Sequence, residues 1–452
     1  MYHCGVCTST ALKGHKELMA IASPNAAAST TTAPSGQSYG APLATVTTLF
    51  FMWGFLTCLN DILVPHLKSI FDLNYTRVML IQFAFFGAYF IFSIPSAKII
   101  DAIGYQRSMV VGLLTMGVGA FLFVPAASVP SYPLFLGALI VLAAGITCLQ
   151  VAANPYVTVL GKPETASSRL NLTQAFNSLG TFLAPFFGGL LILSSAPKTI
   201  EDIRAMAPAD ALAYRLHEAA SVKTPYVGLG IALVLLAVAI GSFKLPKIEH
   251  AQHKVGEKVD DSIWRHPNLI FGAIAIFVYV GAEVSIGSFL VNYFAQPEIG
   301  GLTEKVAASF VAFYWGGAMV GRFIGSALLQ KMKTGGLLGI CAVCAAGLVA
   351  ISMLTSGHFA MYSIILVGFF NSIMFPSIFT LGVAELGPLT GDGSGIMIMA
   401  IVGGAIIPVA QGWIADQIGI HHAFFLPVIC YLYILFFALS GSKPNSERYA
   451  KA

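Results

Sequence analysis

Charged residues are scarce in this chain. They make up 10% of its 452 residues, against about 25% in an average soluble domain. Hydrophobic residues make up 57% and fall in long blocks. The scarcity excludes an ordinary soluble protein, and the small net charge of +4 gives no reason to expect a nucleic-acid partner.

Motifs typical of enzymes and primary pumps are also missing. We find no phosphate-binding P-loop, no nucleophile elbow and no metalloprotease helix. The seven cysteines form no framework, and the single pair Cys4 and Cys7 is poor evidence for zinc. We therefore expect neither an enzyme nor a covalently bound cofactor.

The first 42 residues differ from the rest of the chain. They are rich in Ala, Ser, Thr and Pro, and no apolar run follows Lys13 and Lys16, as a signal peptide would require. Such a composition has little to bury. We predict a disordered cytoplasmic tail over 1–42.

What the chain does have is twelve apolar segments of about 20 residues or more, long enough to cross a bilayer as helices. The lipid core cannot satisfy open backbone groups, so helices are expected throughout. The sequence predicts an all-α membrane protein with twelve transmembrane helices, over 43–67, 78–99, 108–128, 132–159, 171–195, 223–245, 267–294, 304–329, 335–355, 358–384, 391–415 and 420–440.

The placement of lysine and arginine gives an orientation. Most of the 24 lie in the tail, in the loops after even-numbered spans and at the C-terminus. The positive-inside rule then puts both termini in the cytoplasm. The connection 196–222 would lie outside, with a short amphipathic helix over 208–220.

Recurring small residues and prolines divide the helices six and six. Gly180, Pro185 and Gly189 recur with the same spacing as Gly403, Pro408 and Gly412. Pro155, Leu160 and Gly161 recur in the same way as Pro376, Leu381 and Gly382. A third pattern, Gly87, Ala88, Ser96 and Ala97, recurs as Gly317, Ala318, Ser326 and Ala327. We predict two six-helix bundles over 43–245 and 267–441, a cytoplasmic linker over 246–266 and a tail over 442–452. Two parallel six-helix repeats are the arrangement of major facilitator transporters.

Few charged residues remain inside the spans. Asp61 and Glu283 lie well within their helices, whereas Asp101 and Arg322 lie near helix ends and read as gate or loop contacts. A charge at the bilayer centre costs about 2.5–3.5 kcal/mol, so it needs a reason. One possible reason is ion coupling or solute binding. The other is a structural role, in which the carboxyl group caps a kink in its helix or forms a hydrogen bond with a neighbouring helix.

Uncharged amides form a second polar class. Gln150 and Asn154 share one face of a helix, and Gln174, Asn177, Ser178 and Thr181 form a stripe along the next. Gln82, Asn292, Asn371 and Gln411 stand singly, where hydrogen bonds between helices explain them equally well. Amides both donate and accept, which suits a neutral solute with hydroxyls.

Aromatic rings complement the apolar faces of a sugar. Trp53, Tyr314 and Trp315 are candidates, with packing as the alternative for each. Apart from Arg322, no lysine or arginine lies more than one residue from the end of a span, which disfavours an anionic solute. The sequence thus favours a neutral sugar.

Four stretches resemble the fucose-galactose-glucose:cation symporters of the major facilitator superfamily, especially the bacterial glucose/galactose transporter branch. They are 51–55 (FMWGF), 59–63 (LNDIL), 152–161 (AANPYVTVLG) and 169–180 (RLNLTQAFNSLG). The resemblance implies a coupling carboxylate at Asp61, next to Asn60. Fucose:proton relatives carry a second acid where this chain has Gln150, which cannot titrate. Glu283 stands where those relatives carry an amide.

The expected function is uptake of a neutral hexose such as glucose or galactose, by symport with H⁺ or Na⁺ through alternating access. We assign cation coupling to Asp61, Asn60 and Gln150, with Asp61 as a metal ligand only if the ion is sodium. The expected sugar-binding residues are Gln82, Gln150, Asn154, Gln174, Asn177, Glu283, Asn292, Trp315 and Asn371.

Several alternatives stay open. They are a hexose uniporter, a transporter of fucose or N-acetylglucosamine, an exporter of drugs or organic anions, and a non-transporting sugar sensor. The expected partners are a small-molecule sugar and the lipid bilayer. We expect a monomer in the bacterial inner membrane.

Overall fold

The computed structural model describes residues 40–71, 75–128, 131–191, 203, 205–221, 223–246 and 261–444. Within the helices, the side chains of 59–71, 75–80 and 185–191 and of some positions in 212–221 and at 304 lie outside this description. The predicted tails and linker fall largely outside the described ranges. So do Cys4 and Cys7 and the side chains of Asn60 and Asp61.

The first half of the described chain consists mainly of long helices. Arg169 closes the turn between α5 and α6 by donating to the backbone oxygens of Lys162 (2.7 Å) and Thr158 (2.8 Å). The predicted amphipathic helix at 208–220 is confirmed as α8. The elements are α2 (Gly40–Phe71), α3 (Tyr75–Ile103), α4 (Tyr105–Ser128), α5 (Tyr132–Val159), α6 (Ala166–Leu191), α8 (Pro208–Ser221) and α9 (Lys223–Ser242).

The second half begins with three uninterrupted helices and ends with three interrupted ones. The predicted spans 358–384, 391–415 and 420–440 are each divided into shorter elements, which the apolar pattern did not show. The helices are α10 (Pro267–Ala295), α11 (Glu304–Leu328), α12 (Thr334–Leu354), α13 (Gly357–Asn371), α14 (Met374–Gly382), α15 (Thr390–Met399), α16 (Gly403–Ile418), α17 (Ile420–Ala423) and α18 (Phe425–Phe436).

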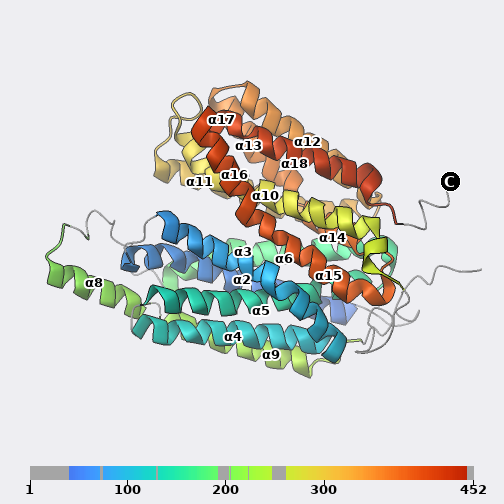
Figure 1. Ribbon diagram of the computed structural model, residues 1–452, viewed down its shortest axis with the longest axis horizontal. Helices are drawn as coiled ribbons and strands as arrows, with labels where there is room; N and C mark the ends of the chain where they lie inside the picture. The colour runs from blue at the N-terminus through green and yellow to red at the C-terminus, as the bar shows by residue number, and fades with distance from the viewer. Residues whose placement is uncertain are drawn as a thin grey trace, which may run out of the picture.

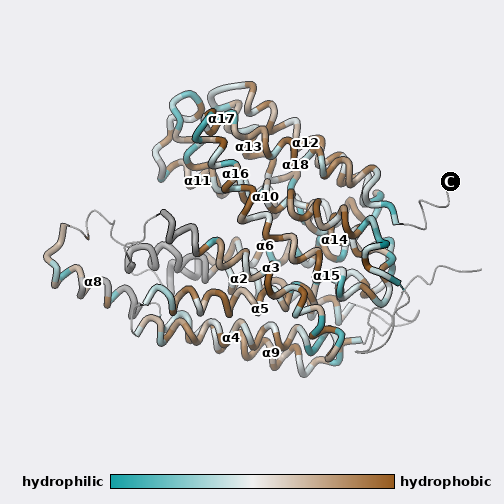
Figure 2. The backbone as a smooth tube through the Cα atoms, in the orientation of Figure 1, coloured by the Kyte–Doolittle hydropathy of each residue, from teal (hydrophilic) through white to brown (hydrophobic). Residues whose placement is uncertain are grey.

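Among the described residues, eleven helical stretches are long and apolar enough to cross a membrane. The predicted span that is not among them is 171–195, which corresponds to α6. Its polar stripe, with Asn171, Gln174 and Asn177, lowers its hydropathy. Figure 2 shows hydrophobic residues along the helices and hydrophilic ones gathered at helix ends and connections. The membrane class is confirmed, and the count of twelve stays a prediction.

Helices α2 to α9 form one bundle and α10 to α18 another (Figure 1). In the first, α4 packs against α5 and α9, and α2 packs against α6. In the second, α10 packs against α11, α16 and α18. The bundles meet where α3 contacts α15 and where α6 contacts α11. The helix α8 projects beyond the rest at one end of the molecule (Figure 1).

The repeated proline has different effects in the two bundles. The helix α5 continues through Pro155, whereas its counterpart is interrupted at Ser372 and Ile373, just before Pro376. Proline has no backbone N–H, so Pro376 cannot donate to the carbonyl oxygen of Ser372 one turn earlier. The interruption between α13 and α14 is therefore a feature of the second bundle alone.

On the predicted cytoplasmic side the two bundles are joined by polar contacts that we call the seam. Its residues are Lys98, Ser167, Ser168, Ser326, Thr380, Asp392 and Ser394. Lys98 Nζ lies 2.8 Å from Asp392 Oδ1 and 3.6 Å from Asp101 Oδ2. Ser168 Oγ donates to the backbone oxygen of Ser326 at 2.7 Å, and Ser394 Oγ to that of Val151 at 2.8 Å. The bundles are thus closed against each other on this side.

Replacing Lys98 by methionine should loosen the seam modestly. The Lys98 side chain is 60% exposed, and exposed ion pairs contribute about 0.2–1 kcal/mol. The open population should therefore rise by no more than about fivefold. We would measure the alkylation rate of a cysteine introduced at Ser394, which is buried in the seam.

Lys331→Met is the matched control, because Lys331 is an exposed lysine in the turn after α11 and outside the seam. It should leave the alkylation rate unchanged. Equal rates in the Lys98 variant and in the control would show that the ion pair does not hold the seam.

Candidate functional site

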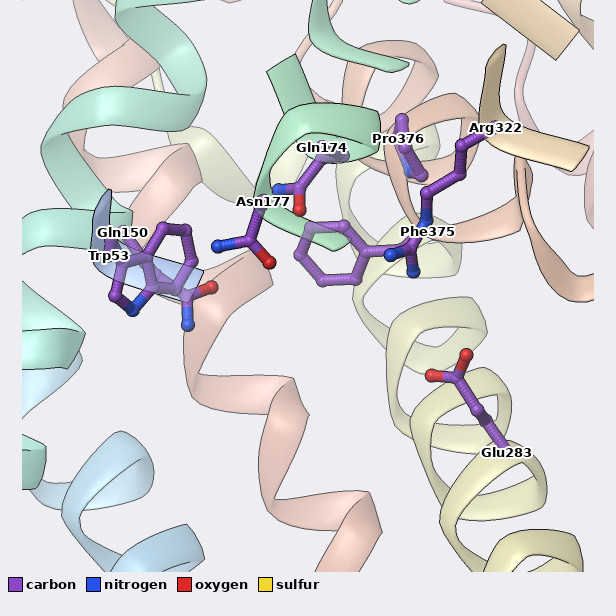
Figure 3. Close-up of a pocket in the computed structure, with 8 residues that line it drawn as sticks. All are labelled: Trp53, Gln150, Gln174, Asn177, Glu283, Arg322, Phe375 and Pro376. Atoms are coloured by element: carbon purple, nitrogen blue, oxygen red, sulfur yellow. The ribbon is translucent and has the colours of Figure 1, made fainter. Parts of the chain in front are cut away.

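A cavity of about 200 Å³ lies between the two bundles. Figure 3 shows its lining residues, with amides and Trp53 on one side and Arg322 and Glu283 on the other. The cavity is smaller than the roughly 300–1,000 Å³ of sites for drug-sized ligands. The residues are Trp53 from α2, Gln150 from α5, Gln174 and Asn177 from α6, Glu283 from α10, Arg322 from α11, and Phe375 and Pro376 from α14.

Close packing of α2 and α6 sets the first wall. A Cβ atom on Gly54 would collide with the backbone oxygen of Asn177, and one on Gly180 with that of Phe51. Only glycine allows this approach, which brings Trp53 and Asn177 to the same wall. Asn177 Nδ2 also donates to the backbone oxygen of Phe50 at 2.9 Å, so the wall is fixed by backbone as well as by packing.

Each amide of this wall is held through its NH₂ group. Gln150 Nε2 donates to Tyr89 Oη at 2.7 Å, and Gln174 Nε2 donates to Asn154 Oδ1 at 3.3 Å. Neither bond uses the carbonyl oxygen of Gln150 or Gln174. These oxygens are acceptors for the hydroxyl groups of a solute.

The opposite wall carries the two charges. Arg322 Nε donates to the Ser372 backbone oxygen at 3.2 Å, the oxygen that Pro376 leaves without its helical donor. Arg322 Nη1 donates to Ser178 Oγ on α6, which links the two bundles beside the cavity. The Glu283 carboxylate accepts a hydrogen bond from Tyr279 Oη at 2.8 Å.

Behind this wall, Asn371 is surrounded by Tyr279, Tyr314 and Tyr431, which we call the tyrosine cluster. Asn371 Nδ2 donates to Tyr314 Oη at 2.8 Å, and Tyr431 Oη donates to Asn371 Oδ1 at 2.8 Å. Tyr279 Oη also lies 3.1 Å from the Asn371 backbone oxygen. All three tyrosines are fully buried. The cluster joins α10, α11 and α18 to the last residue of α13.

The cavity brings four of the sequence-predicted residues together: Gln150, Gln174, Asn177 and Glu283. Asn154 is buried behind Gln174, and Asn371 lies in the tyrosine cluster. Gln82 and Asn292 are exposed and do not line the cavity. Trp315 is 46% exposed and stands edge-on to Tyr314, with ring centroids 5.1 Å apart. The side chains of Asp61 and Asn60 are outside the described part.

Sequence reasoning missed Arg322, Phe375 and Pro376 as cavity residues. Arg322 read as a gate or loop contact because it lies near the end of its helix, yet its long side chain reaches the cavity. A signal was available, because an acid inside the membrane calls for a partner. Glu283 had none in the sequence, and Arg322 was the one lysine or arginine lying more than one residue from the end of a predicted span.

Gln411 in α16 is a different case, because it is fully buried and neither atom of its amide has a hydrogen-bond partner among the described residues. An unsatisfied buried polar group costs about 1–3 kcal/mol. Gln411→Leu should therefore raise the midpoint of thermal unfolding of the purified protein by a few degrees.

The matched control for Gln411 is Gln106→Leu. Gln106 Nε2 donates to the backbone oxygens of Ile240 (2.8 Å) and Phe243 (2.6 Å). Its loss should lower the thermal midpoint, because it leaves these acceptors unpaired. A lower midpoint for both variants would mean that Gln411 has a partner in the membrane.

Two bundles of membrane helices around a central polar cavity define the class of protein. The chain matches the Major Facilitator Superfamily over residues 43–402. It belongs to this superfamily, as the sequence predicted, and it is a multi-pass membrane transporter rather than an enzyme.

Particular relatives cover nearly the whole chain. It is 55% identical to the "Glucose/galactose transporter" of Brucella abortus over 90% of this chain and 96% of the relative. It is 36% identical to the "L-fucose-proton symporter" of Escherichia coli over 90% of this chain and 94% of the relative. A crystal structure described as a major facilitator transporter, FucP, in the outward conformation superposes with a TM-score of 0.83 at 36% identity, covering 90% of this chain and 100% of that chain.

Proposed function

We propose that the protein is a secondary active transporter that takes up a neutral hexose of the glucose or galactose type together with a cation. The observation that carries this proposal is the small cavity with amides from α5 and α6 on one wall. The names of its relatives, a glucose/galactose transporter and a fucose-proton symporter, support the same class of solute and the same coupling.

The chemistry of the cavity suits a sugar. Carbonyl oxygens of Gln150 and Gln174 are placed to accept from sugar hydroxyls, and the indole of Trp53 offers an apolar face to the ring. Arg322 and Glu283 bring one charge of each sign. Glu283 would repel an anion and Arg322 would repel a cation, whereas a neutral polyol can form hydrogen bonds with both.

The proposed mechanism is alternating access between the two bundles. The seam closes the predicted cytoplasmic side, so the described state receives sugar from the opposite side. Cation binding at Asp61, beside Asn60 and close in sequence to the cavity residue Trp53, lowers the cost of burying its charge. Linkage then requires sugar and cation each to tighten the binding of the other.

The coupling ion is a proton or a sodium ion. A single carboxyl group such as Asp61 suits a proton, whereas sodium needs several oxygen ligands, which Asp61 would share with amide and backbone carbonyl oxygens. Gln150 cannot titrate, and its NH₂ group donates a hydrogen bond to Tyr89 Oη. It contributes to ion coupling only as a neutral ligand.

The test is uptake and counterflow in proteoliposomes that contain the purified protein. A panel of labelled sugars, including glucose, galactose, fucose and N-acetylglucosamine, is offered under a proton gradient or a sodium gradient alone. Accumulation above the external concentration with one gradient supports symport and names the ion. Equilibration without accumulation indicates a uniporter, and no movement of any sugar would favour the sensor.

The remaining proposals concern the oligomeric state, the membrane and the orientation of the chain. We propose a monomer in the bacterial inner membrane with both termini in the cytoplasm, following the lysine and arginine distribution. Labelling of cysteines introduced in α8 from outside intact cells tests the orientation. A large apolar pocket, as an exporter of drugs would need, is not what the cavity lining offers.

A further inference from the structure

Tyr279 stands between the cavity and the interruption of the tenth predicted span. Its hydroxyl oxygen lies 2.8 Å from Glu283 Oε1, at the cavity, and 3.1 Å from the backbone oxygen of Asn371, the last residue of α13. A tyrosine hydroxyl has one hydrogen, so it can donate to only one of these two acceptors at a time. The two acceptors compete for it.

The charge on Glu283 decides this competition. An ionised Glu283 only accepts, and as a charged acceptor it draws the Tyr279 hydrogen to itself. The Asn371 carbonyl then loses this donor. A protonated Glu283 has a hydrogen of its own, which it donates to Tyr279 Oη, and Tyr279 turns its hydrogen to the Asn371 carbonyl. No bond breaks other than hydrogen bonds, and the one proton gained by Glu283 comes from water.

We propose that Glu283 is a second proton-coupling group and that Tyr279 is the positioning residue that transmits its protonation to the interruption between α13 and α14. This proposal rests on the proposed function. The neighbouring carbonyl, that of Ser372, is held by Arg322. The carbonyl oxygens of Asn371 and Ser372 are therefore both bound by residues that touch the cavity or Glu283.

The interruption is also where a change would reach the solute. Phe375 and Pro376, in the first turn of α14, line the cavity with Glu283. Arg322 connects the same backbone to Ser178 in the other bundle. A shift of α14 would thus alter both the sugar pocket and a contact between the bundles.

The surroundings of Glu283 contain few other groups that titrate. In the described part of the chain they are Tyr279 on α10, Arg322 and Tyr314 on α11, and Tyr431 on α18. Of these groups, Glu283 is the one whose charge changes as a proton is carried.

The test uses the full-length protein in proteoliposomes and compares Glu283→Gln, Tyr279→Phe and the unaltered chain. Sugar counterflow is measured across pH 5 to 9, and sugar affinity is measured by the change in intrinsic tryptophan fluorescence on titration with sugar, to which Trp53 at the cavity contributes. In the unaltered protein we expect the counterflow rate to change about tenfold over this range, as is typical of coupled sites. In Glu283→Gln both the rate and the affinity should lose the part of this pH dependence that does not come from Asp61.

Tyr279→Phe tests the transmission apart from the titration of Glu283, because it removes the hydroxyl group that links Glu283 to the interruption between α13 and α14. Glu283 still titrates, so sugar affinity should keep its full pH dependence, while the counterflow rate should lose the part that Glu283 supplies. Tyr433→Phe is the matched control, because Tyr433 on α18 donates to the backbone oxygen of Phe271 on α10 at 3.3 Å and does not line the cavity. It should keep both profiles.

The outcomes distinguish the two proposals. If the unaltered protein moves no sugar, the proposed function fails. If it moves sugar and Tyr279→Phe keeps the pH profile of the rate, transmission through Tyr279 is wrong. If Glu283→Gln keeps the profile, or if transport by the unaltered chain does not depend on pH, Glu283 is not a coupling group.

Discussion

Replacing Asp61 by asparagine should abolish uphill sugar accumulation while leaving sugar exchange in place. Asparagine resembles the loaded, neutral form of the carboxyl group, so the carrier would reorient without an ion. A carrier without coupling only equilibrates its solute, and the accumulation ratio should fall to about 1. Gradient-driven uptake and counterflow in the same proteoliposomes measure the two activities.

Asp101→Asn is a comparison for Asp61, because Asp101 lies near the end of α3 beside the seam residue Lys98. It changes an acid of the same kind away from the cavity, and accumulation should persist. Full gradient-driven accumulation by the Asp61 variant would remove Asp61 from the coupling site and leave Glu283, the acid that lines the cavity, as the candidate.

Arg322→Gln should reduce transport by up to about 100- to 4,000-fold. Arg322 and Glu283 are opposite charges that line the same cavity. Leaving a charge in such a site without compensation costs up to about 3–5 kcal/mol, and each tenfold in rate corresponds to about 1.4 kcal/mol. The variant also loses the bonds to Ser372 and Ser178. Initial rates of sugar counterflow measure the loss.

A double variant controls for charge. Arg322→Gln combined with Glu283→Gln leaves the cavity neutral, so folding yield and thermal midpoint should recover towards those of the unaltered protein. Coupling should not recover, because neither the acid nor the contact between the bundles returns. A single Arg322 variant that transports at the normal rate would mean that this side chain is not part of the cavity in the membrane.

The architecture was largely predictable, because lipid imposes it. Long apolar runs have to form helices, and the recurrence of Pro155 as Pro376 correctly indicated the repeat. The interruptions of the second bundle were not predictable from hydropathy. Ser372 and Ile373 sit in an apolar run, and only the hydrogen bonds of Arg322 and Tyr279 show why an interrupted backbone is tolerated there.

The site was predictable in its residue types and less so in its assembly. Gln150, Gln174, Asn177 and Glu283 were chosen because polar groups are costly in a membrane, and they meet at the cavity. The cost of a polar group in the membrane does not distinguish an amide that binds solute from Asn371, which forms hydrogen bonds within the tyrosine cluster. Sequence spacing says which residues share a helix face, but not what the facing helix presents.

The seam shows what a gate of this kind requires. Its contacts are mostly hydroxyl groups on backbone oxygens, with one exposed ion pair. When such a surface parts, water replaces each bond nearly one for one, so opening has a small net cost. An oily seam of equal area would lose its burial energy at every opening. A polar seam therefore allows the two bundles to separate and close again at a small cost in free energy.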